Sequence, residues 1–242
     1  RNEKPWKCKF AKLYSDKFRR EYSEFMKPVH SPGENSARRG SIRVGFVNTS
    51  KEGPFLLWLK GLMVNLSREK FSVSVLCYEK SRQKIIDGID KFDGGANLEG
   101  VGNDSGVDFF YLDSLSMEDT IKRIRAEKFD ALLYNEIGTR TANFILPFFR
   151  LAPIQCGYWC GATSGSPEMD YFISSDLVEP ENGHDYVIEK LVRLKSPLIH
   201  FTPSRMPAAL NSRSFYGLPE TAHIYSCFQN LHKLHPDTDE VF

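Results

Sequence analysis

Residues 116–134 read SMEDTIKRIRAEKFDALLY and contain a helix signal followed directly by a strand signal. Ser116 and Asp119 stand at the spacing of a capping box, and isoleucines in the next turn supply an apolar face, which predicts a helix over 116–128. The run from Ala131 to Tyr134 is apolar throughout, as is typical of a central parallel strand buried on both faces. This stretch therefore predicts an α/β fold with a parallel sheet.

The same alternation of strand and helix continues on both sides of this stretch. Pro54, for example, is suited to the first turn of a helix. The predicted strands are 42–47, 71–78, 108–112, 130–134, 154–159, 171–174 and 190–194, and the predicted helices are 54–66, 83–92, 116–128 and 141–149. This repetition predicts the fold class, an α/β, Rossmann-like, doubly wound parallel sheet.

Composition divides the chain into four parts. Residues 1–40 carry eleven Lys and Arg against five Asp and Glu, and we expect a helix over 11–30 followed by a linker. Such a basic arm is more often a solvated helix or leader segment than a contact for an acidic partner or a membrane surface. We expect the Rossmann-like lobe over 41–195 and a proline-rich interdomain connection over 196–220. Residues 221–242 then supply the first strand and the helix start of an incomplete second lobe.

The overall composition excludes several classes of function. The 242 residues carry a formal net charge of +1, so the chain as a whole has no nucleic-acid signature. The sequence contains no run of about 18 apolar residues, so it predicts no membrane-spanning helix, and the N-terminus has no apolar signal core. The five cysteines are scattered and odd in number, which indicates a reducing compartment: the cytoplasm, or the nucleus in a eukaryote. They also lack metal-ligand spacing, so we expect no metal site.

Polar loops follow several of the predicted strands, at the edge of an open α/β sheet where ligands bind. The loop 48–53 is polar and could accept a ligand, but it carries no glycine-rich dinucleotide fingerprint. Glu136 directly follows a buried strand and is a candidate acid–base or hydroxyl-binding group. It could also cap the next helix or pair with Arg140.

A further loop, 157–165, is rich in small residues and hydroxyl groups. Its last three residues are Thr163, Ser164 and Gly165. Such a composition could let a backbone approach a ligand closely, or it could form a simple tight turn.

A strand-to-helix junction is predicted near the C-terminal end of the chain. Residues 224–227 are strand-like, Pro236 marks a helix start, and the turn between them holds Gln229, Asn230 and Lys233. A lysine beside a helix N-terminus suits a phosphate or diphosphate. An isolated lysine, however, is usually only solvated.

Longer motifs carry a family resemblance. They are RLAPIQC at 150–156, TSG at 163–165, MDYFISSD at 169–176 and the turn at 224–237, together with the opening strand RVGFV at 43–47. Over about residues 41–242, the sequence resembles the catalytic region of the O-GlcNAc transferase/SPINDLY family.

The resemblance implies one lobe of a glycosyltransferase-B architecture, in which two Rossmann-like lobes face each other across a cleft. It implies metal-independent transfer of a sugar from a nucleotide-sugar donor to Ser or Thr of an acceptor protein. The donor is typically UDP-GlcNAc, and SPINDLY-type members use GDP-fucose. Tetratricopeptide repeats upstream in the same parent chain would be further partners, and no cofactor besides the donor substrate is expected.

The resemblance also assigns roles to residues. Lys233 matches the family lysine that holds the donor diphosphate and steadies the leaving group. Gln229 matches the polar donor-binding position of the same turn, with Asn230 a neighbouring candidate. We expect the TSG residues at 163–165 to contribute to the donor side of the cleft, and Glu136 to the catalytic side.

Two loops depart from the family pattern. The loop 50–54 lacks a histidine and is one residue shorter, and the loop 159–162 lacks a proline. These changes support a second hypothesis, a degenerate, non-catalytic relative that acts as a binding or scaffold module. A generic Rossmann-fold nucleotide-binding protein would explain the strand–helix pattern but not the motifs.

Overall fold

The computed structural model contains two compact units, 1–204 and 205–242. It describes residues 2–31, 40–49, 54–83, 85, 107–113, 115–135, 137–138, 140–158, 162–199, 210–230 and 233–237. The boundary between the units falls inside 196–220, the stretch predicted as an interdomain connection.

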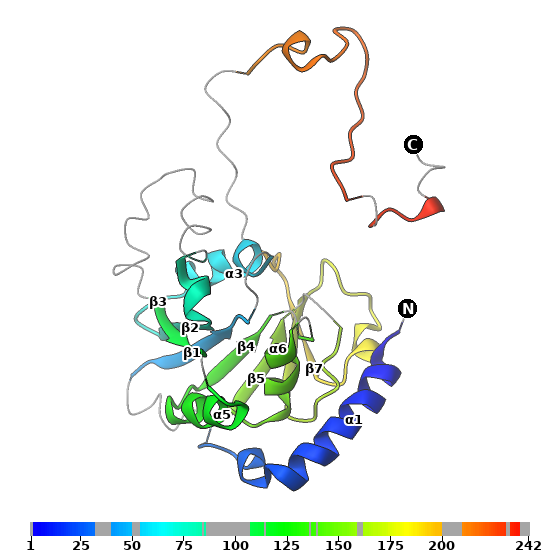
Figure 1. The fold of residues 1–242 in the computed structure, drawn as a ribbon. Helices are drawn as coiled ribbons and strands as arrows, with labels where there is room; N and C mark the ends of the chain where they lie inside the picture. Colours follow the sequence, from blue (N-terminus) through cyan, green and yellow to red (C-terminus); the bar gives the residue numbers. More distant parts are fainter. Residues whose placement is uncertain are drawn as a thin grey trace. The chain divides into compact units, whose positions relative to one another are not determined.

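One parallel sheet organises the first unit (Figure 1). Its described strands are β1 (Ile42–Val47), β2 (Phe71–Cys77), β3 (Val107–Tyr111), β4 (Ala131–Tyr134), β5 (Ile154–Tyr158), β6 (Tyr171–Ser175) and β7 (Lys190–Leu194). Their order across the sheet is β3-β2-β1-β4-β5-β6-β7, and every neighbouring pair is parallel. The predicted fold class, a Rossmann-like doubly wound sheet, is confirmed.

Helices cover both faces of this sheet. The longer ones are α1 (Lys4–Glu21), α3 (Pro54–Asn65), α5 (Met117–Ala126) and α6 (Thr141–Ile145), and the short 3-10 helices are η1 (Ser23–Met26), η2 (Leu146–Phe148) and η3 (Gly183–Tyr186). Two apolar clusters form the core. One contains residues of α1, α5 and η2, and the other contains Leu59 and Met63 of α3.

Successive residues of the central strands point into opposite clusters. Phe46 of β1 pairs with Leu133 of β4, and both lie in the cluster under α3. The next pair, Val47 and Tyr134, lies in the cluster under α5. Because both faces are buried, the strand sequence is apolar without alternation, which is the pattern that predicted a central strand.

The helix signals of the sequence are confirmed at the start of α5 and modified at the end of α6. The Ser116 hydroxyl accepts a hydrogen bond from the Asp119 amide at 3.0 Å, as a capping box requires. The helix predicted over 141–149 changes to a 3-10 turn after Ile145. Pro147 explains the change, because it has no amide hydrogen to donate within an α-helix and its ring crowds the preceding turn.

The N-terminal region requires a correction. The sequence predicted a helix over 11–30, outside a domain beginning at residue 41, whereas α1 begins at Lys4 and belongs to the first unit. Ala11 and Phe18 are buried, and the Phe18 ring lies 5.1 Å from the Phe149 ring between centroids. The basic arm therefore forms part of the core, because its apolar face packs on residues distant in sequence.

The C-terminal unit also differs from expectation. The predicted strand over 224–227 is not formed, and Tyr225 and Phe228 are 90% and 100% exposed. Its described residues contain the short helix η4 (Ser214–Tyr216) and no strand. A strand requires hydrogen bonds from a neighbouring strand, and the described part of this unit offers none.

Candidate functional site

The candidate site lies at the carboxyl edge of the sheet, where the topology reverses direction. From β1 the sheet extends through β2 to β3, whereas from β4 it extends the other way through β5, β6 and β7. Strands β1 and β4 are neighbours, so the segments that follow them leave the sheet in opposite directions. Ligands of open α/β sheets bind in the crevice at this switch point.

Three neutral polar residues occupy the switch point. Asn48 and Thr49 follow β1, Asn135 follows β4, and all three are buried. The last residues of the two strands, Val47 and Tyr134, are paired, so these polar residues leave adjacent strands.

The main chain of Asn135 is hydrogen-bonded, but its side chain is not, among the described residues. Its carbonyl oxygen accepts a hydrogen bond from the Asn143 amide. Within the part of the chain that the structure describes, the Asn135 side chain has no hydrogen-bond partner for its oxygen or its nitrogen. The hydroxyl oxygen of Thr49 has no partner there either. A buried polar group without a partner costs about 1–3 kcal/mol, and a neutral hydrogen-bonding ligand would remove that cost. Sequence reasoning singled out the loops after both strands but not Asn135, whose signal is an amide directly after a buried strand.

Burial keeps the ionisable groups of the neighbouring strands neutral. It raises the pKa of the Cys156 thiol to about 12, and it also raises the pKa of the Tyr134 phenol. Both groups are therefore protonated at neutral pH. The described part of the switch point thus supplies hydrogen bonds rather than a base or a nucleophile.

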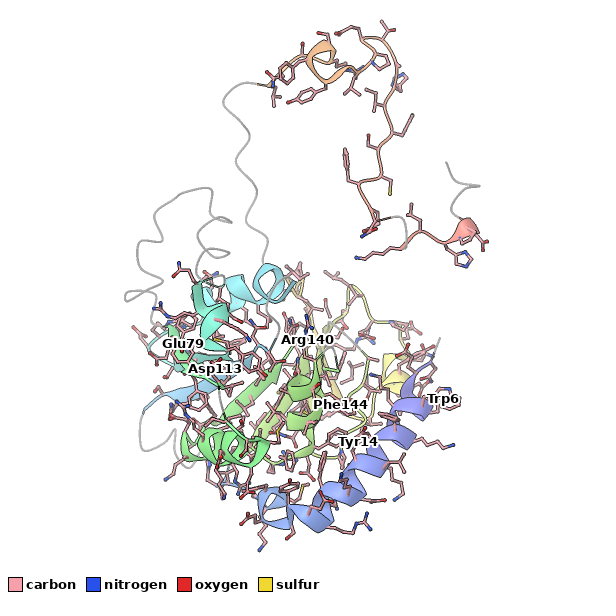
Figure 2. The ribbon with its side chains drawn as sticks, viewed as in Figure 1. Trp6, Tyr14, Glu79, Asp113, Arg140 and Phe144 are labelled. Carbon is pink, nitrogen blue, oxygen red and sulfur yellow. The ribbon has the colours of Figure 1, made fainter. Side chains whose placement is uncertain are left out.

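The predicted catalytic residue Glu136 lies outside the described residues. Its predicted acid–base role therefore stays a prediction, and so do the alternatives that it caps the next helix or pairs with Arg140. Arg140 is exposed beside α6 (Figure 2). Within the described ranges, no three His, Cys, Asp or Glu side chains gather as a metal site would require.

Thr163 and Ser164 are brought together by one buried carboxyl group. Glu189 accepts hydrogen bonds from Thr163 Oγ1 at 2.6 Å, from the Ser164 amide at 2.8 Å and from the Ser164 hydroxyl. The three side chains are buried. Their shared network attaches the loop after β5 to the segment before β7.

The backbone of α1 lies so close to Gly165 that it leaves no room for a side chain there. Its φ of 74° is in the left-handed region, and a Cβ at this position would lie 2.6 Å from the Lys7 carbonyl oxygen. The sequence predicted a close approach to a ligand at this loop, whereas the close approach at Gly165 is to the backbone of α1.

The predicted donor-binding residues lie together in the C-terminal unit. The Lys233 amide donates to the Asn230 carbonyl oxygen at 2.9 Å, and the Asn230 amide donates to Gln229 Oε1 at 2.9 Å. All three residues are exposed. These hydrogen bonds link the three residues locally, although the strand predicted before them is not formed, and their donor-binding role stays a prediction.

One curated relative matches most of the chain, and others match about half of it. It is similar to the probable UDP-N-acetylglucosamine–peptide N-acetylglucosaminyltransferase SEC of Arabidopsis thaliana, with 25% identity over 222 residues that cover 88% of this chain and 21% of SEC. The probable transferase SPINDLY of Solanum lycopersicum is 32% identical over 128 residues, covering 49% of this chain and 13% of SPINDLY. The chain thus spans about a fifth or less of the length of these relatives. No protein-family model matches it.

A solved structure shares the fold. A mutant O-GlcNAc transferase of Thermobaculum terrenum superimposes with a TM-score of 0.58 and 17% identity, covering 77% of this chain and 34% of that chain. The sheet is thus of the kind found in one lobe of the glycosyltransferase-B architecture. The resemblance to the O-GlcNAc transferase/SPINDLY family is confirmed by these matches.

Proposed function

We propose that this chain, a relative of the SEC and SPINDLY O-GlcNAc transferases, supplies the Rossmann-like lobe of a protein O-glycosyltransferase. It would move a sugar, GlcNAc in the first instance, from a nucleotide-sugar donor to Ser or Thr of an acceptor protein. The observation that carries the proposal is that Thr49 and Asn135, at the switch point of the sheet, have buried side chains without a hydrogen-bond partner among the described residues, in a chain similar to SEC. Neutral donors and acceptors of this kind suit the hydroxyl and amide groups of sugars and peptides.

The reaction requires an acceptor, a base and a stabilised leaving group. The hydroxyl oxygen of the acceptor attacks the anomeric carbon of the sugar, and the bond from that carbon to the diphosphate breaks. Glu136 is the candidate to receive the hydroxyl proton. Lys233 is the candidate to stabilise the developing charge on the departing diphosphate, with Gln229 and Asn230 orienting the donor. We propose that no metal takes part, because the lysine supplies the positive charge.

A second candidate function is a non-catalytic binding module. Its specific support is that Glu189 engages the hydroxyls of both Thr163 and Ser164, so these predicted donor contacts are already satisfied. The altered loops at 50–54 and 159–162 favour the same interpretation.

The decisive experiment measures donor hydrolysis and transfer to protein with UDP-GlcNAc and GDP-fucose in parallel, with EDTA present. The protein should be the natural polypeptide that contains this chain. Turnover of one donor would establish a transferase and name its sugar. A folded protein that neither turns over nor binds either donor would support the binding-module function instead.

Lys233→Ala tests the proposed leaving-group role. Loss of one such interaction should lower kcat by about 10²–10³. Lys27→Ala removes another exposed lysine and serves as the matched control. Equal turnover by the two variants would remove Lys233 from the mechanism.

A further inference from the structure

The outward face of α1 carries an apolar stripe. Trp6, Phe10 and Leu13 are spaced four and three residues apart, so they lie on one side of the helix. They are 68%, 53% and 66% exposed, although the opposite side of the same helix is buried through Ala11 and Phe18. Exposed Trp and Phe side chains grouped on one surface are typical of interaction sites.

A hollow adjoins this stripe. It has a volume of about 590 Å³ and lies between the first half of α1 and the loops that follow β4 and β5. Its lining includes Trp6, Phe10, Phe144, Gly138 and Ser164. The Phe10 and Phe144 rings are 6.1 Å apart between centroids, so the hollow has an aromatic wall contributed by two helices. Figure 2 labels Trp6 on α1 and Phe144 on α6.

The helix beside the hollow is basic in its first half. Lys4, Lys7, Lys9 and Lys12 all lie in the first half of α1. Lys12 pairs with Asp16 at 3.1 Å, and Lys9 Nζ lies 6.0 Å from the Trp6 ring centroid. Lys7 lines the hollow itself, and a Cβ at Gly138 would lie 3.6 Å from Lys7 Nζ. Glu3, also in the lining, balances Lys7 there, so the excess of positive charge lies on the neighbouring lysines of the helix.

We propose that the hollow beside α1 binds an acidic segment of a partner protein, which inserts an apolar side chain between Trp6 and Phe144. The aromatic wall would hold the inserted side chain, and the lysines would face the acidic residues on either side of it. This surface is separate from the switch point, and the proposal does not depend on the transfer of a sugar.

Charge and shape favour this occupant over two others. A second copy of the chain would bring the lysines of α1 against each other, which like-charge repulsion disfavours. An anionic membrane would satisfy the lysines, but a flat bilayer offers no discrete side chain to fill a concave hollow. The hollow has the size and the mainly apolar lining of a specific binding site.

The test uses the 242-residue chain and short fluorescent peptides. One peptide alternates Asp or Glu with Phe and Leu, a second replaces its acids with Lys, and a third replaces its apolar residues with Ser. Only the first peptide should bind, measured by fluorescence anisotropy, and added salt should weaken its binding. Vesicles containing phosphatidylserine, sedimented with the protein, test the membrane alternative.

Variants locate the binding surface. Trp6→Ala and Lys7→Glu should each lower the affinity for the acidic peptide by about tenfold or more. Leu177→Ala, which removes an apolar side chain that is also 66% exposed, should leave binding unchanged. Thermal unfolding should be similar for Trp6→Ala and Leu177→Ala, because both side chains are exposed.

Three results would overturn the proposal. The first is that the acidic peptide does not bind, or that it binds the Trp6→Ala variant as tightly as it binds the unchanged chain. Another is vesicle binding that depends on Trp6 in place of peptide binding. The third is a concentration-dependent dimer that Trp6→Ala abolishes, which would make a second copy the occupant.

Discussion

A side-chain carbon at Gly165 would lie 2.6 Å from the carbonyl oxygen of Lys7 and 2.8 Å from its carbonyl carbon. These distances are shorter than van der Waals contact, so the first half of α1 can approach the loop after β5 only where that loop has no side chain. Gly165 and Lys7 are distant in sequence, and their contact attaches the N-terminal helix to the sheet.

Gly165→Ala should therefore destabilise the first unit. We expect a loss of about 2–4 kcal/mol in the free energy of unfolding, from steric overlap and from the positive φ. Gly40→Ala is the matched control, because Gly40 has a φ of 75° and no atom of the described residues lies within 4 Å of its Cβ position. Urea unfolding should show a cost of about 1 kcal/mol for the control. Equal costs for the two variants would contradict the close contact with α1.

Glu189→Gln should weaken the network that holds Thr163 and Ser164. The amide nitrogen of Gln cannot accept the hydrogen bond that a carboxyl oxygen accepts, so one buried donor loses its partner, at a cost of about 1–3 kcal/mol. Glu181→Gln, at an exposed position, should be neutral. The urea midpoints of the two variants make the comparison, and an unshifted midpoint for Glu189→Gln would count against the network.

Asn135→Leu should stabilise the ligand-free chain. Replacing an unsatisfied buried amide by an apolar side chain removes a cost of about 1–3 kcal/mol, which raises Tm by about 2–4 °C per kcal/mol in a chain of this size. In an active protein the same change should abolish binding at the switch point. Asn143→Leu should have the opposite effect on Tm, because the Asn143 amide donates to the Asn135 carbonyl. A fall in Tm for both variants would show that the Asn135 amide is already satisfied.

Alkaline pH should destabilise the protein through two buried thiols. Burial raises the pKa of both Cys77 and Cys156 to about 12, from an ordinary value of 9.0. Between these values the unfolded chain loses the proton that the folded chain retains, so stability falls as pH rises from about 9 to 12. Each thiol contributes at most about 1.4 kcal/mol per pH unit. The Cys77→Ala and Cys156→Ala double variant should flatten this slope in urea titrations, whereas Cys227→Ala, at an exposed position, should not.

The sheet was predictable because its signals are local. The Ser116 cap and the apolar run from Ala131 to Tyr134 depend on neighbouring residues, and their positions agree with α5 and β4. The position of α1 was not predictable, because Phe18 is buried by Phe148 and Phe149, about 130 residues further along the chain. The strand expected over 224–227 depends on a partner strand, which local sequence does not supply.

The candidate site was predictable in its place but not in its residues. Polar loops after β1 and β4 marked the switch point, and Glu136 drew attention because carboxylates are familiar catalytic groups. Asn135 was missed, because only the structure shows that its amide is buried without a partner among the described residues. For Thr163 and Ser164, the interaction with Glu189 depends on packing between two loops, and their spacing in the sequence gave no sign of it.

The long sequence separation between α1 and the residues on which it packs has a consequence for synthesis on the ribosome. Arg19 forms an ion pair with Glu168, which lies 149 residues further along the chain. Translation at 5–20 residues per second leaves the helix without this docking surface for on the order of 10 s. During that interval the nascent chain exposes Phe18 as well as Trp6 and Phe10, so α1 is a segment that chaperones would encounter.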